Sequence, residues 1–278
     1  MSAGGALVTG AGQGLGKEIA LRLGRRGYAV HVTDVDAALA AETARTIGDS
    51  AWSSHLDVRD ADACAAAAQQ TAERGGSLAL WVNNAGVLET GPLWERDMDV
   101  WRRVLDINLG GTMHGMAAAL EVMRPARRGH IVNIASLAGL VAVPGEAVYA
   151  ATKHGVLGLS QSTLADLRSD GLADIDISCI CPDGMWTPML HDRLREPEAA
   201  MSFSGTLLRP ERVADLCEKV LDRPRPVVST PRWRGALARA SSAAPRVMLK
   251  GLPATQALGR LQQRRLVKKG VDRFEERP

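Results

Sequence analysis

A glycine-rich turn, T-G-A-G-Q-G-L-G, stands between a short apolar run at residues 3–9 and a segment of helical periodicity at residues 14–29. Its glycines follow the spacing T-G-x-x-x-G-x-G, with Gly10, Gly14 and Gly16 at the defining positions. Glycine lets a backbone turn sharply and approach a pyrophosphate closely, and a helix N-terminus stabilises the negative charge. Strand, turn and helix in this order predict a phosphate-binding loop, with a tight turn that binds nothing as the alternative.

The rest of the N-terminal half repeats this alternation of apolar run and helix. Apolar runs at residues 28–34, 50–58 and 77–82 alternate with Ala-rich segments, and each run ends at or near Asp, Asn or Gly. The alternation predicts an α/β fold: a doubly wound, Rossmann-like parallel sheet of about seven strands flanked by helices, forming a single domain over residues 1–230. Polar strand ends would then line a crevice at the carboxyl edge of the sheet.

Asp34 lies at the predicted C-terminal end of the second strand. A carboxylate at this place suits the two hydroxyls of an adenosine ribose and repels a 2′-phosphate. No Lys or Arg stands inside the glycine turn or directly beside Asp34 to neutralise such a phosphate. The expected cofactor is therefore NAD rather than NADP. The alternative role, for Asp34 or for Asp36, is a cap on the helix that follows.

Tyr149 and Lys153 stand four residues apart in an Ala-rich, proline-free segment that begins after Pro144-Gly145. At this spacing they share one helix face, one turn apart. A free phenol, with a pKa of ~10, is a poor base at neutral pH, and an adjacent ammonium is expected to lower that pKa. A hydroxyl from Ser136, at a strand end, would bond the same substrate oxygen. The three groups suit proton transfer to or from an alcohol, whereas Tyr149 and Lys153 alone would be an ordinary surface pair.

Seven motifs occur in order along the chain: T-G-A-G-Q-G-L-G, Asp34, L-D-V, N-N-A-G, Asn108 within L-D-I-N-L-G-G, Ser136, and Tyr149-x-x-x-Lys153. Together they closely resemble the short-chain dehydrogenase/reductase family over residues 3–225. The resemblance implies that Tyr149 is the acid/base, that Lys153 lowers its pKa and binds the nicotinamide ribose, and that Ser136 orients the carbonyl. It also implies that Asn108 holds a water in a proton relay to Lys153.

The resemblance further assigns a set of cofactor-binding residues in the glycine turn, at the strand ends and in the loop after the strand at residues 173–180. They are Gly10, Gln13, Gly14, Leu15, Gly16, Asp34, Asp57, Val58, Asn84, Ala85, Gly86, Tyr149, Lys153, Pro182, Gly184, Met185 and Thr187. The family usually has P-G-x-V-x-T in that last loop, and Asp183 replaces its glycine here. Asp183 is expected to be a turn carboxylate, with Gly184 supplying the flexibility one position later.

Residues 186–208 stand where the family carries its substrate lid. Its apolar members are expected to close over an apolar substrate: Trp186, Met189, Leu190, Met201, Phe203 and Leu207. Further predicted pocket walls are Leu88, Leu93, Trp94, Leu137, Val141 and Val143. Ordinary core packing is the alternative for each of them.

The C-terminal extension, residues 231–278, lies beyond the resemblance and is basic. From Arg232 onward it has 12 Lys and Arg against 3 Asp and Glu, although the whole chain has a net charge of only +3. Leu258, Leu261, Val267, Val271 and Phe274 approximate one apolar stripe. The alternatives are a helix that closes the pocket or a neighbouring subunit, a solvated tail, or weak contact with a membrane surface. Nucleic-acid binding is not expected, because no reading motif accompanies the charge.

The remaining features bound the setting of the protein. The four cysteines have neither metal-ligand nor disulfide spacing, so buried thiols and no metal are expected. The N-terminus lacks the pattern of a signal peptide, and the expected compartment is the cytoplasm. Gly155 and Gly158 are costly within a helix, and close helix approach would explain them. The family resemblance implies that this helix packs across a subunit interface, so a homo-oligomer, dimer or tetramer, is expected.

The favoured hypothesis is an NAD-dependent oxidoreductase that interconverts a secondary alcohol and a ketone by hydride transfer. An apolar, cyclic or steroid-like small molecule is the expected substrate, given the Met-, Trp- and Leu-rich lid. The alternative is a regulator or scaffold that binds NAD without turnover, but such proteins typically lose the Tyr, Lys or Ser that this chain keeps.

Overall fold

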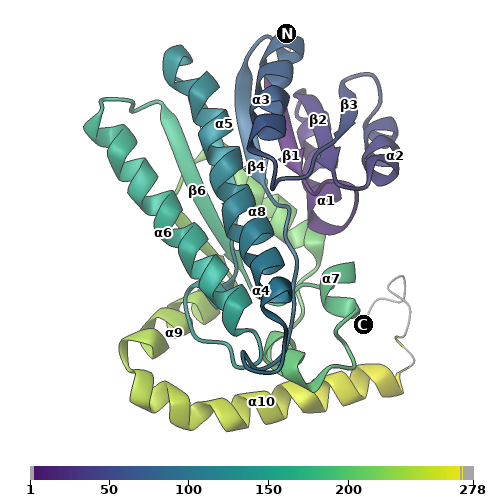
Figure 1. Ribbon diagram of the computed structural model, residues 1–278, viewed down its shortest axis with the longest axis vertical. Helices are drawn as coiled ribbons and strands as arrows, with labels where there is room; N and C mark the ends of the chain where they lie inside the picture. Colours follow the sequence, from purple (N-terminus) through teal and green to yellow (C-terminus); the bar gives the residue numbers. More distant parts are fainter. Residues whose placement is uncertain (1–2, 270, 272–278) are drawn as a thin grey trace.

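One parallel sheet forms the centre of the computed structural model, which describes residues 3–269 and Val271 (Figure 1). Its strands are β1 (Gly5–Thr9), β2 (Ala29–Asp34), β3 (Ala51–His55), β4 (Leu78–Asn83), β5 (Gly129–Ile134), β6 (Ile175–Pro182) and β7 (Val227–Thr230). The order is β3-β2-β1-β4-β5-β6-β7, with all neighbours parallel. The predicted doubly wound fold is confirmed. The order reverses between β1 and β4, which opens a crevice at the carboxyl ends of the strands.

Helices cover both faces of this sheet and divide the core in two. Successive strand residues point to opposite faces, so Val8 packs with α1, α2 and α8, whereas Leu7 packs with α3, α5 and α6. The helices with four or more residues are α1 (Gly14–Arg25), α2 (Ala37–Ile47), α3 (Ala61–Gly75), α4 (Met98–Leu105), α5 (Gly111–Ala126), α6 (Ala147–Ser169), α7 (Pro188–His191), α8 (Pro210–Asp222), α9 (Arg232–Ala243) and α10 (Pro245–Lys268). Three further helical segments are not α-helices: η1 (Asp106–Gly110) is a π-helical turn, and η2 (Leu137–Gly139) and η3 (Pro197–Phe203) are 3-10 helices.

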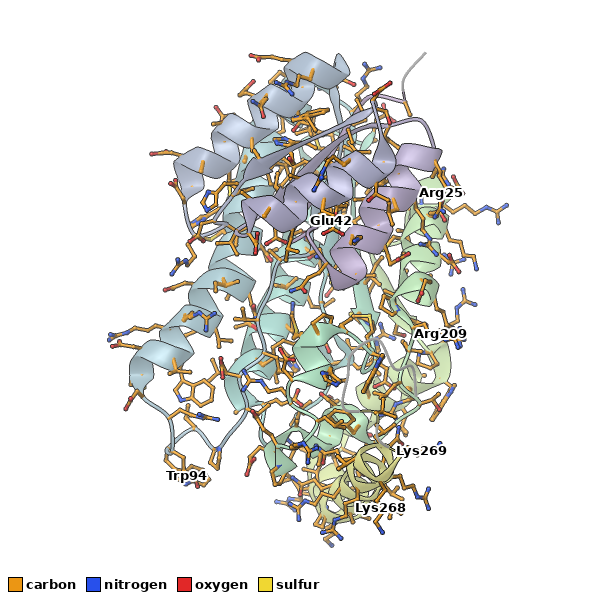
Figure 2. All side chains as sticks on the ribbon, turned by 90° about the vertical axis from the view of Figure 1, so that its right-hand side faces the viewer. Arg25, Glu42, Trp94, Arg209, Lys268 and Lys269 are labelled. Carbon is orange, nitrogen blue, oxygen red and sulfur yellow. The ribbon has the colours of Figure 1, made fainter. Side chains whose placement is uncertain are left out.

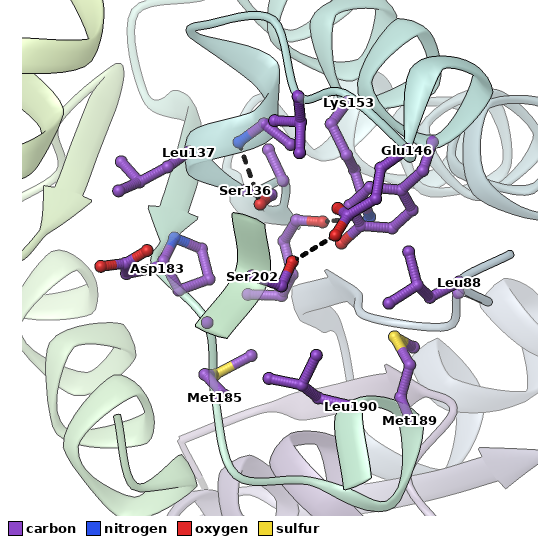
Figure 3. A pocket seen from close by; sticks show the side chains of 18 of the residues that line it. Leu88, Ser136, Leu137, Glu146, Lys153, Asp183, Met185, Met189, Leu190 and Ser202 are labelled. Atoms are coloured by element: carbon purple, nitrogen blue, oxygen red, sulfur yellow. Dashed lines mark hydrogen bonds between the residues drawn. The ribbon is translucent and has the colours of Figure 1, made fainter. Parts of the chain in front are cut away.

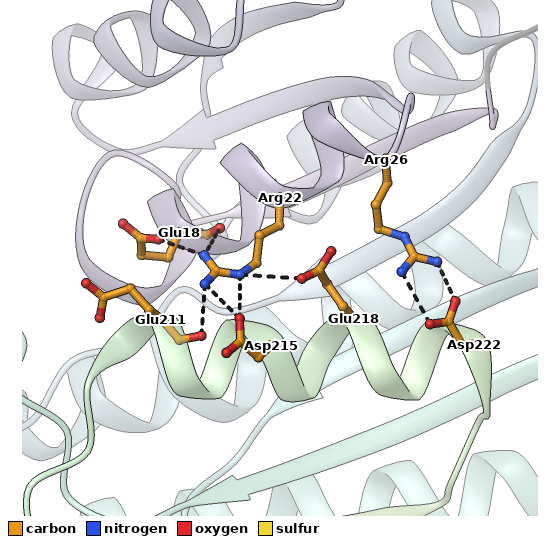
Figure 4. A network of polar contacts seen from close by, with 7 residues as sticks. All are labelled: Glu18, Arg22, Arg26, Glu211, Asp215, Glu218 and Asp222. Atoms are coloured by element: carbon orange, nitrogen blue, oxygen red, sulfur yellow. Dashed lines mark hydrogen bonds and ion pairs between the residues drawn. The ribbon is translucent and has the colours of Figure 1, made fainter.

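A polar network joins α1 to α8 (Figure 4). The Arg22 guanidinium donates to Glu18 and to Asp215, each at 2.8 Å, and to the backbone oxygen of Glu211 at 3.1 Å. The Arg22 side chain is 11% exposed, and those of Glu18 and Asp215 are 29% and 55% exposed, so these bonds lie at a partly buried surface. Hydrogen bonds to a charged group in such a setting contribute more than an exposed ion pair does.

Replacing Arg22 by methionine, which keeps the aliphatic stem, is expected to lower the free energy of unfolding by about 1–2 kcal/mol. The matched control is Lys17→Met, which removes a more exposed pair with Glu42 at 3.1 Å and is expected to cost well under ~1 kcal/mol. Urea denaturation of both variants measures the difference. Equal losses in the two variants would show that Arg22 acts as an ordinary surface cation.

The C-terminal extension is helical and lies along the base of the molecule in Figure 1. On α10, Leu266 packs in one apolar cluster with Trp186 and Phe203, and Gln263 Nε2 donates to the backbone oxygen of Glu196 at 2.8 Å. A β-carbon at Gly259 would lie 1.8 Å from the Ala200 oxygen, so only glycine allows this contact. The described part of the extension is therefore packed on η3 and is not a solvated tail.

The predicted apolar stripe of the extension is wrong as a single face. Leu258 and Leu261 are exposed, whereas Val271 is buried and Val267 is partly buried on the packed side. Phe274, the last member of the predicted stripe, lies outside the described residues. Among the described residues, every helix is too short or too polar to cross a membrane.

Candidate active site

A cavity of about 1090 Å³ opens at the carboxyl ends of the strands. All the predicted cofactor-binding residues except Gly16 line it, as do Ser136, Tyr149 and Lys153. The topology explains this meeting, because parallel strands bring the ends of β1, β2, β4, β5 and β6 to one edge of the sheet. In the described part of the chain, no group of three His, Cys, Asp or Glu side chains is placed to hold a metal ion.

The glycine loop leaves room for a ligand against the backbone. Gly10 and Gly14 have φ values of +62° and +56°, which favour glycine. A β-carbon at Gly16 would lie 2.1 Å from the backbone oxygen of Gly10, so only glycine fits there. Gly16 packs against the loop and does not line the cavity. No side chain caps the N-terminus of α1, and its first turn contains no acidic residue. These features fit a pyrophosphate bound at the helix N-terminus.

Asp34 ends β2 at the edge of the cavity. One carboxylate oxygen accepts from Gly12 N at 2.8 Å and the other from Asp36 N at 3.0 Å. Asp36 accepts from Ala38 N and Leu39 N and therefore caps α2, so the alternative of a helix cap holds for Asp36 and not for Asp34. The two backbone bonds fix the Asp34 carboxylate and leave lone pairs free for the hydroxyls of a ribose.

The turn after β4 is tied to the glycine loop. Asn84 Nδ2 donates to the Thr9 and Gly10 oxygens at 3.0 and 2.9 Å, so this side chain braces the loop while its backbone borders the cavity. Asn83 Nδ2 donates to Asn133 Oδ1 on the neighbouring strand β5 at 2.8 Å and so braces the sheet. After β3, Asp57 is paired with Arg59, a cavity-lining residue that the sequence did not single out.

Tyr149 and Lys153 lie on α6, one turn apart, and face the end of β5. Lys153 Nζ donates to the Ile134 oxygen at 3.0 Å and stands 5.5 Å from the centre of the Tyr149 ring. Ser136 follows β5 in extended backbone, and its Oγ accepts from Ala138 N at 3.1 Å (Figure 3). Ser136 and Tyr149 both line the cavity, and the Ser136 side chain is close enough to lower the Tyr149 pKa. The predicted trio is thus brought together at one point of the cavity.

The net shift of the Tyr149 pKa is upward, opposite to the direction expected from Lys153 alone. Burial raises the Tyr149 pKa above its usual value of 10, the nearby Glu146 carboxyl raises it further, and only the Ser136 side chain lowers it. Burial also lowers the Lys153 pKa to about 8. Desolvation outweighs the attraction that the spacing alone suggests.

Asn108 lies in η1, a π-helical turn between α4 and α5, and is fully buried. Its side chain holds the backbone of Val87: the Val87 N donates to Oδ1 at 2.8 Å, and Nδ2 donates to the Val87 oxygen at 2.9 Å. It does not line the cavity. The contacts shown by Asn108 therefore position the loop after β4, and its role in a proton relay stays a prediction.

The predicted lid, residues 186–208, divides into two sets of side chains. Trp186 and Phe203 are buried in the cluster of the C-terminal extension, whereas Met189, Leu190 and Met201 line the cavity. Leu207 packs against that cluster and does not line the cavity. Of the further predicted walls, Leu88, Leu137, Val141 and Val143 line it. Leu93 and Trp94 do not, and Trp94 is 84% exposed and projects from the surface (Figure 2).

Residues 5–198 match the sequence model of a family described as short chain dehydrogenase. The chain belongs to the short-chain dehydrogenase/reductase family. A trans-4-hydroxycyclohexanecarboxylate dehydrogenase of Sinomonas cyclohexanicum is 40% identical to this family member over 193 residues, 66% of this chain and 73% of that protein. A cyclohexanol dehydrogenase of Acinetobacter sp. (strain SE19) is 33% identical over 215 residues, 76% and 84% of the two chains.

A solved structure supports the same assignment. A short-chain dehydrogenase/reductase from Burkholderia phymatum, in complex with NAD, superposes with a TM-score of 0.80 at 28% identity and covers 89% of this chain and 95% of that one. The family match and the dehydrogenase relatives together show that this short-chain dehydrogenase is an oxidoreductase that acts on CH–OH groups. The family match ends before α8, β7 and the extension.

Asp183, where this short-chain dehydrogenase departs from the family pattern, pairs with the extension. Its Oδ2 lies 2.7 Å from Arg234 Nε on α9. Glycine is required at position 184 by a close approach and not by an unusual backbone angle, since a β-carbon there would lie 2.1 Å from the backbone oxygen of Ser202. The turn carboxylate expected at Asp183 is therefore also an anchor for α9.

Glu146 is the residue of the active site that sequence reasoning missed. It precedes α6, is 1% exposed, lines the cavity, and accepts from Ser202 Oγ at 2.6 Å (Figure 3). Burial raises its pKa from 4.5 to about 7. An acidic residue at a helix start is common because it suits the helix dipole, so nothing in the sequence marks this one as buried beside Tyr149.

Proposed function

We propose that this enzyme uses NAD to interconvert a secondary alcohol and a ketone, with Tyr149 as the acid/base. The observation that carries the proposal is that Ser136, Tyr149 and Lys153 line the same cavity as the glycine loop and Asp34. When bound, the nicotinamide ring supplies or accepts the hydride. The Rossmann relative solved with NAD supports the choice of cofactor.

Tyr149 and Ser136 would manage the charge on the substrate oxygen. In ketone reduction the oxygen becomes an alkoxide, which Ser136 stabilises by donating a hydrogen bond while the Tyr149 hydroxyl transfers its proton. The raised Tyr149 pKa keeps the phenol in the protonated form that this direction requires. Alcohol oxidation needs the phenolate instead, and protonated Lys153, with its pKa near 8, is the neighbouring positive charge that favours it.

The cofactor would lie across the sheet edge. The glycine loop, with Gln13 and Leu15, would hold the pyrophosphate, Asp34 the adenosine ribose, and Lys153 the nicotinamide ribose. The strand ends and the loop after β6 would border the two ring systems: Asp57, Val58, Asn84, Ala85, Gly86, Pro182, Gly184, Met185 and Thr187. The distribution of these residues along one cavity supports this placement.

The proposed substrate is an uncharged, apolar and cyclic alcohol or ketone. Leu88, Leu137, Val141, Val143 and Met189 supply apolar walls. Every arginine that lines the cavity is paired with a carboxylate: Arg59 with Asp57, Arg103 with Glu89, and Arg234 with Asp183. Within the part of the chain that the structure describes, no lining arginine is left for a substrate carboxylate, and a cyclohexanol type therefore fits better than a cyclohexanecarboxylate type.

Two measurements test the proposal. Fluorescence titration compares binding of NADH and NADPH, and absorbance at the nicotinamide band follows turnover of cyclohexanol, cyclohexanone and trans-4-hydroxycyclohexanecarboxylate. We expect tighter binding of NADH and turnover of the uncharged pair. Turnover of the carboxylate alone would contradict the substrate class, and tight NADH binding without turnover of any apolar alcohol or ketone would favour a regulator.

Replacing Asp34 by alanine is expected to weaken the preference for NADH over NADPH by about tenfold or more, because the repulsion of a 2′-phosphate and the ribose bonds are both removed. The ratio of the two dissociation constants measures this change. Asp36→Ala is the matched control: it removes a carboxylate two residues away that caps α2, and its ratio should stay near that of the wild type. A wild type that already prefers NADPH would contradict the role of Asp34.

We also propose a homo-oligomer that pairs through α5 and α6. Gly158 faces open space, so a partner helix can approach it, and Met113 on α5 is 50% exposed. Gly155 is already in contact with Leu109 of the same chain and needs no partner to explain it.

A further inference from the structure

The cavity continues beyond the active site into the C-terminal extension. Leu237 on α9 and Val247, Met248, Leu252 and Leu258 on α10 line this part. These side chains are apolar, so the passage suits a molecule without charge. The match to the family model ends at residue 198 and does not include this region.

The rim of this passage is apolar and faces solvent. Trp233, Leu237, Val247 and Leu258 line the cavity and yet are 65%, 58%, 71% and 61% exposed. Exposed apolar side chains gathered round an opening mark a surface that contacts another apolar phase or partner. The passage therefore opens where α9 and α10 present apolar side chains.

The same two helices carry a strong positive charge. From Arg232 to Lys269 the sequence contains ten Lys and Arg and no Asp or Glu, and all ten except Arg234 are exposed. Among the described residues, only Arg234 of these ten forms an ion pair. The rest of the chain is net negative, because the whole chain carries only +3. The excess of positive charge is thus carried by the helices that surround the opening.

Apolar and basic residues share one outer side of α10. Val247, Lys250, Leu258, Leu261, Arg265 and Lys268 recur at helical spacing and are all exposed. They lie opposite Gly259, Gln263 and Leu266, which pack against the lid. Together with Trp233 and Leu237 of α9, these six residues form what we call the outer face. Lys268, near the end of α10, is visible at the surface in Figure 2.

We propose that the outer face docks on a lipid membrane with anionic headgroups and that apolar substrate reaches the cavity from that membrane. Basic residues attract anionic headgroups while neighbouring apolar side chains insert among the acyl chains. A protein seated on this face would cover the opening of the passage, whereas a lipid surface supplies apolar molecules to it. Docking does not depend on the proposed reaction and is tested without turnover.

The experiment uses the full chain with vesicles of phosphatidylcholine alone or with about one third phosphatidylglycerol, at roughly physiological salt. Co-sedimentation measures the bound fraction. We expect binding only to the anionic vesicles. The triple variant Lys250→Gln, Arg265→Gln and Lys268→Gln is expected to bind about 100-fold more weakly, at roughly fivefold for each charge removed.

The matched control removes the same number of charges elsewhere. Arg25→Gln, Arg128→Gln and Arg209→Gln replace exposed arginines outside the extension, and this variant should bind nearly as the wild type does. Arg25 and Arg209 are labelled on the body of the molecule in Figure 2. Equal loss in both triple variants would mean that only net charge matters and would overturn the assignment of the outer face.

Two further outcomes overturn the proposal. One is the absence of binding to anionic vesicles, or equal binding to neutral ones. The other is a dimer in light scattering that the outer-face variant dissociates, because a second copy would then occupy this face. A failure of turnover on apolar alcohols with vesicle binding intact would count against the proposed reaction and leave the docking in place.

Discussion

A Tyr149→Phe variant is expected to lose about a thousandfold or more in kcat while still binding NADH within roughly twofold of the wild type. The substitution removes one hydroxyl and leaves the ring that packs beside Lys153. If that hydroxyl transfers the proton, no other group in contact with Ser136 replaces it, and the reaction proceeds only through water. Stopped-flow absorbance measures the hydride step, and fluorescence titration measures cofactor binding.

The chain supplies its own control for this variant. It contains two tyrosines, and Tyr28 is partly buried against the core cluster under α1, outside the cavity lining. Tyr28→Phe removes the same atom and is expected to leave kcat nearly unchanged. Residual activity of Tyr149→Phe near that of Tyr28→Phe would end the assignment of Tyr149 as acid/base. Loss of NADH binding in Tyr149→Phe would point to a damaged site and not to a missing proton.

The fold followed from local patterns because each pattern has one physical solution. The apolar runs that end at Asp34, Asp57 and Asn83 alternate with helices, and buried parallel strands satisfy this alternation. Parallel strands then bring all their carboxyl ends to one edge. The four-residue spacing of Tyr149 and Lys153 likewise fixes one helix face. The predicted residues therefore meet in one cavity, and their roles stay predictions.

What the sequence did not indicate depends on burial and on distant contacts. The Tyr149 pKa is governed by desolvation and by Glu146, neither of which spacing reveals. Trp186 and Phe203 were assigned to pocket walls, but Leu266 of the extension, more than fifty residues away along the chain, packs in one cluster with them. Leu258 was placed on one apolar stripe with Val267 and Val271, yet the glycine contact at Gly259 turns a neighbouring face of α10 inward.

Stability is expected to fall as the pH rises through the range in which Glu146 ionises. The unfolded chain loses this proton near pH 4.5, whereas burial holds it in the folded protein up to about pH 7. The stabilising contribution of the protonated carboxyl is therefore full below 4.5 and is lost as the pH rises to about 7. The difference between the two pKa values corresponds to about 3 kcal/mol of unfolding free energy.

The Glu146→Gln variant isolates this effect, because glutamine has a similar size and does not ionise. Burial lowers the pKa values of His31 and His130 from 6.5 to about 4, so these two residues act in the opposite sense. Their contribution to the unfolding free energy increases as the pH rises from about 4 to 6.5. Urea denaturation gives the unfolding free energy of the wild type and of Glu146→Gln at each pH. Both proteins contain the two histidines, so the contribution of the histidines cancels in the difference between the two curves. This difference should change by about 3 kcal/mol between pH 4.5 and pH 8 in favour of the variant.

Two further variants test whether the pH dependence of stability comes from the buried Glu146 carboxyl. Ser202→Ala removes the hydrogen bond that lowers the Glu146 pKa, so the midpoint of the loss should move to higher pH. Glu121→Gln, an exposed carboxyl on α5, should follow the wild-type curve. Parallel curves for the wild type and Glu146→Gln would show that Glu146 ionises as an exposed carboxyl does. Because the Glu146 carboxylate raises the Tyr149 pKa, a confirmed shift also means that Glu146→Gln moves alcohol oxidation toward lower pH.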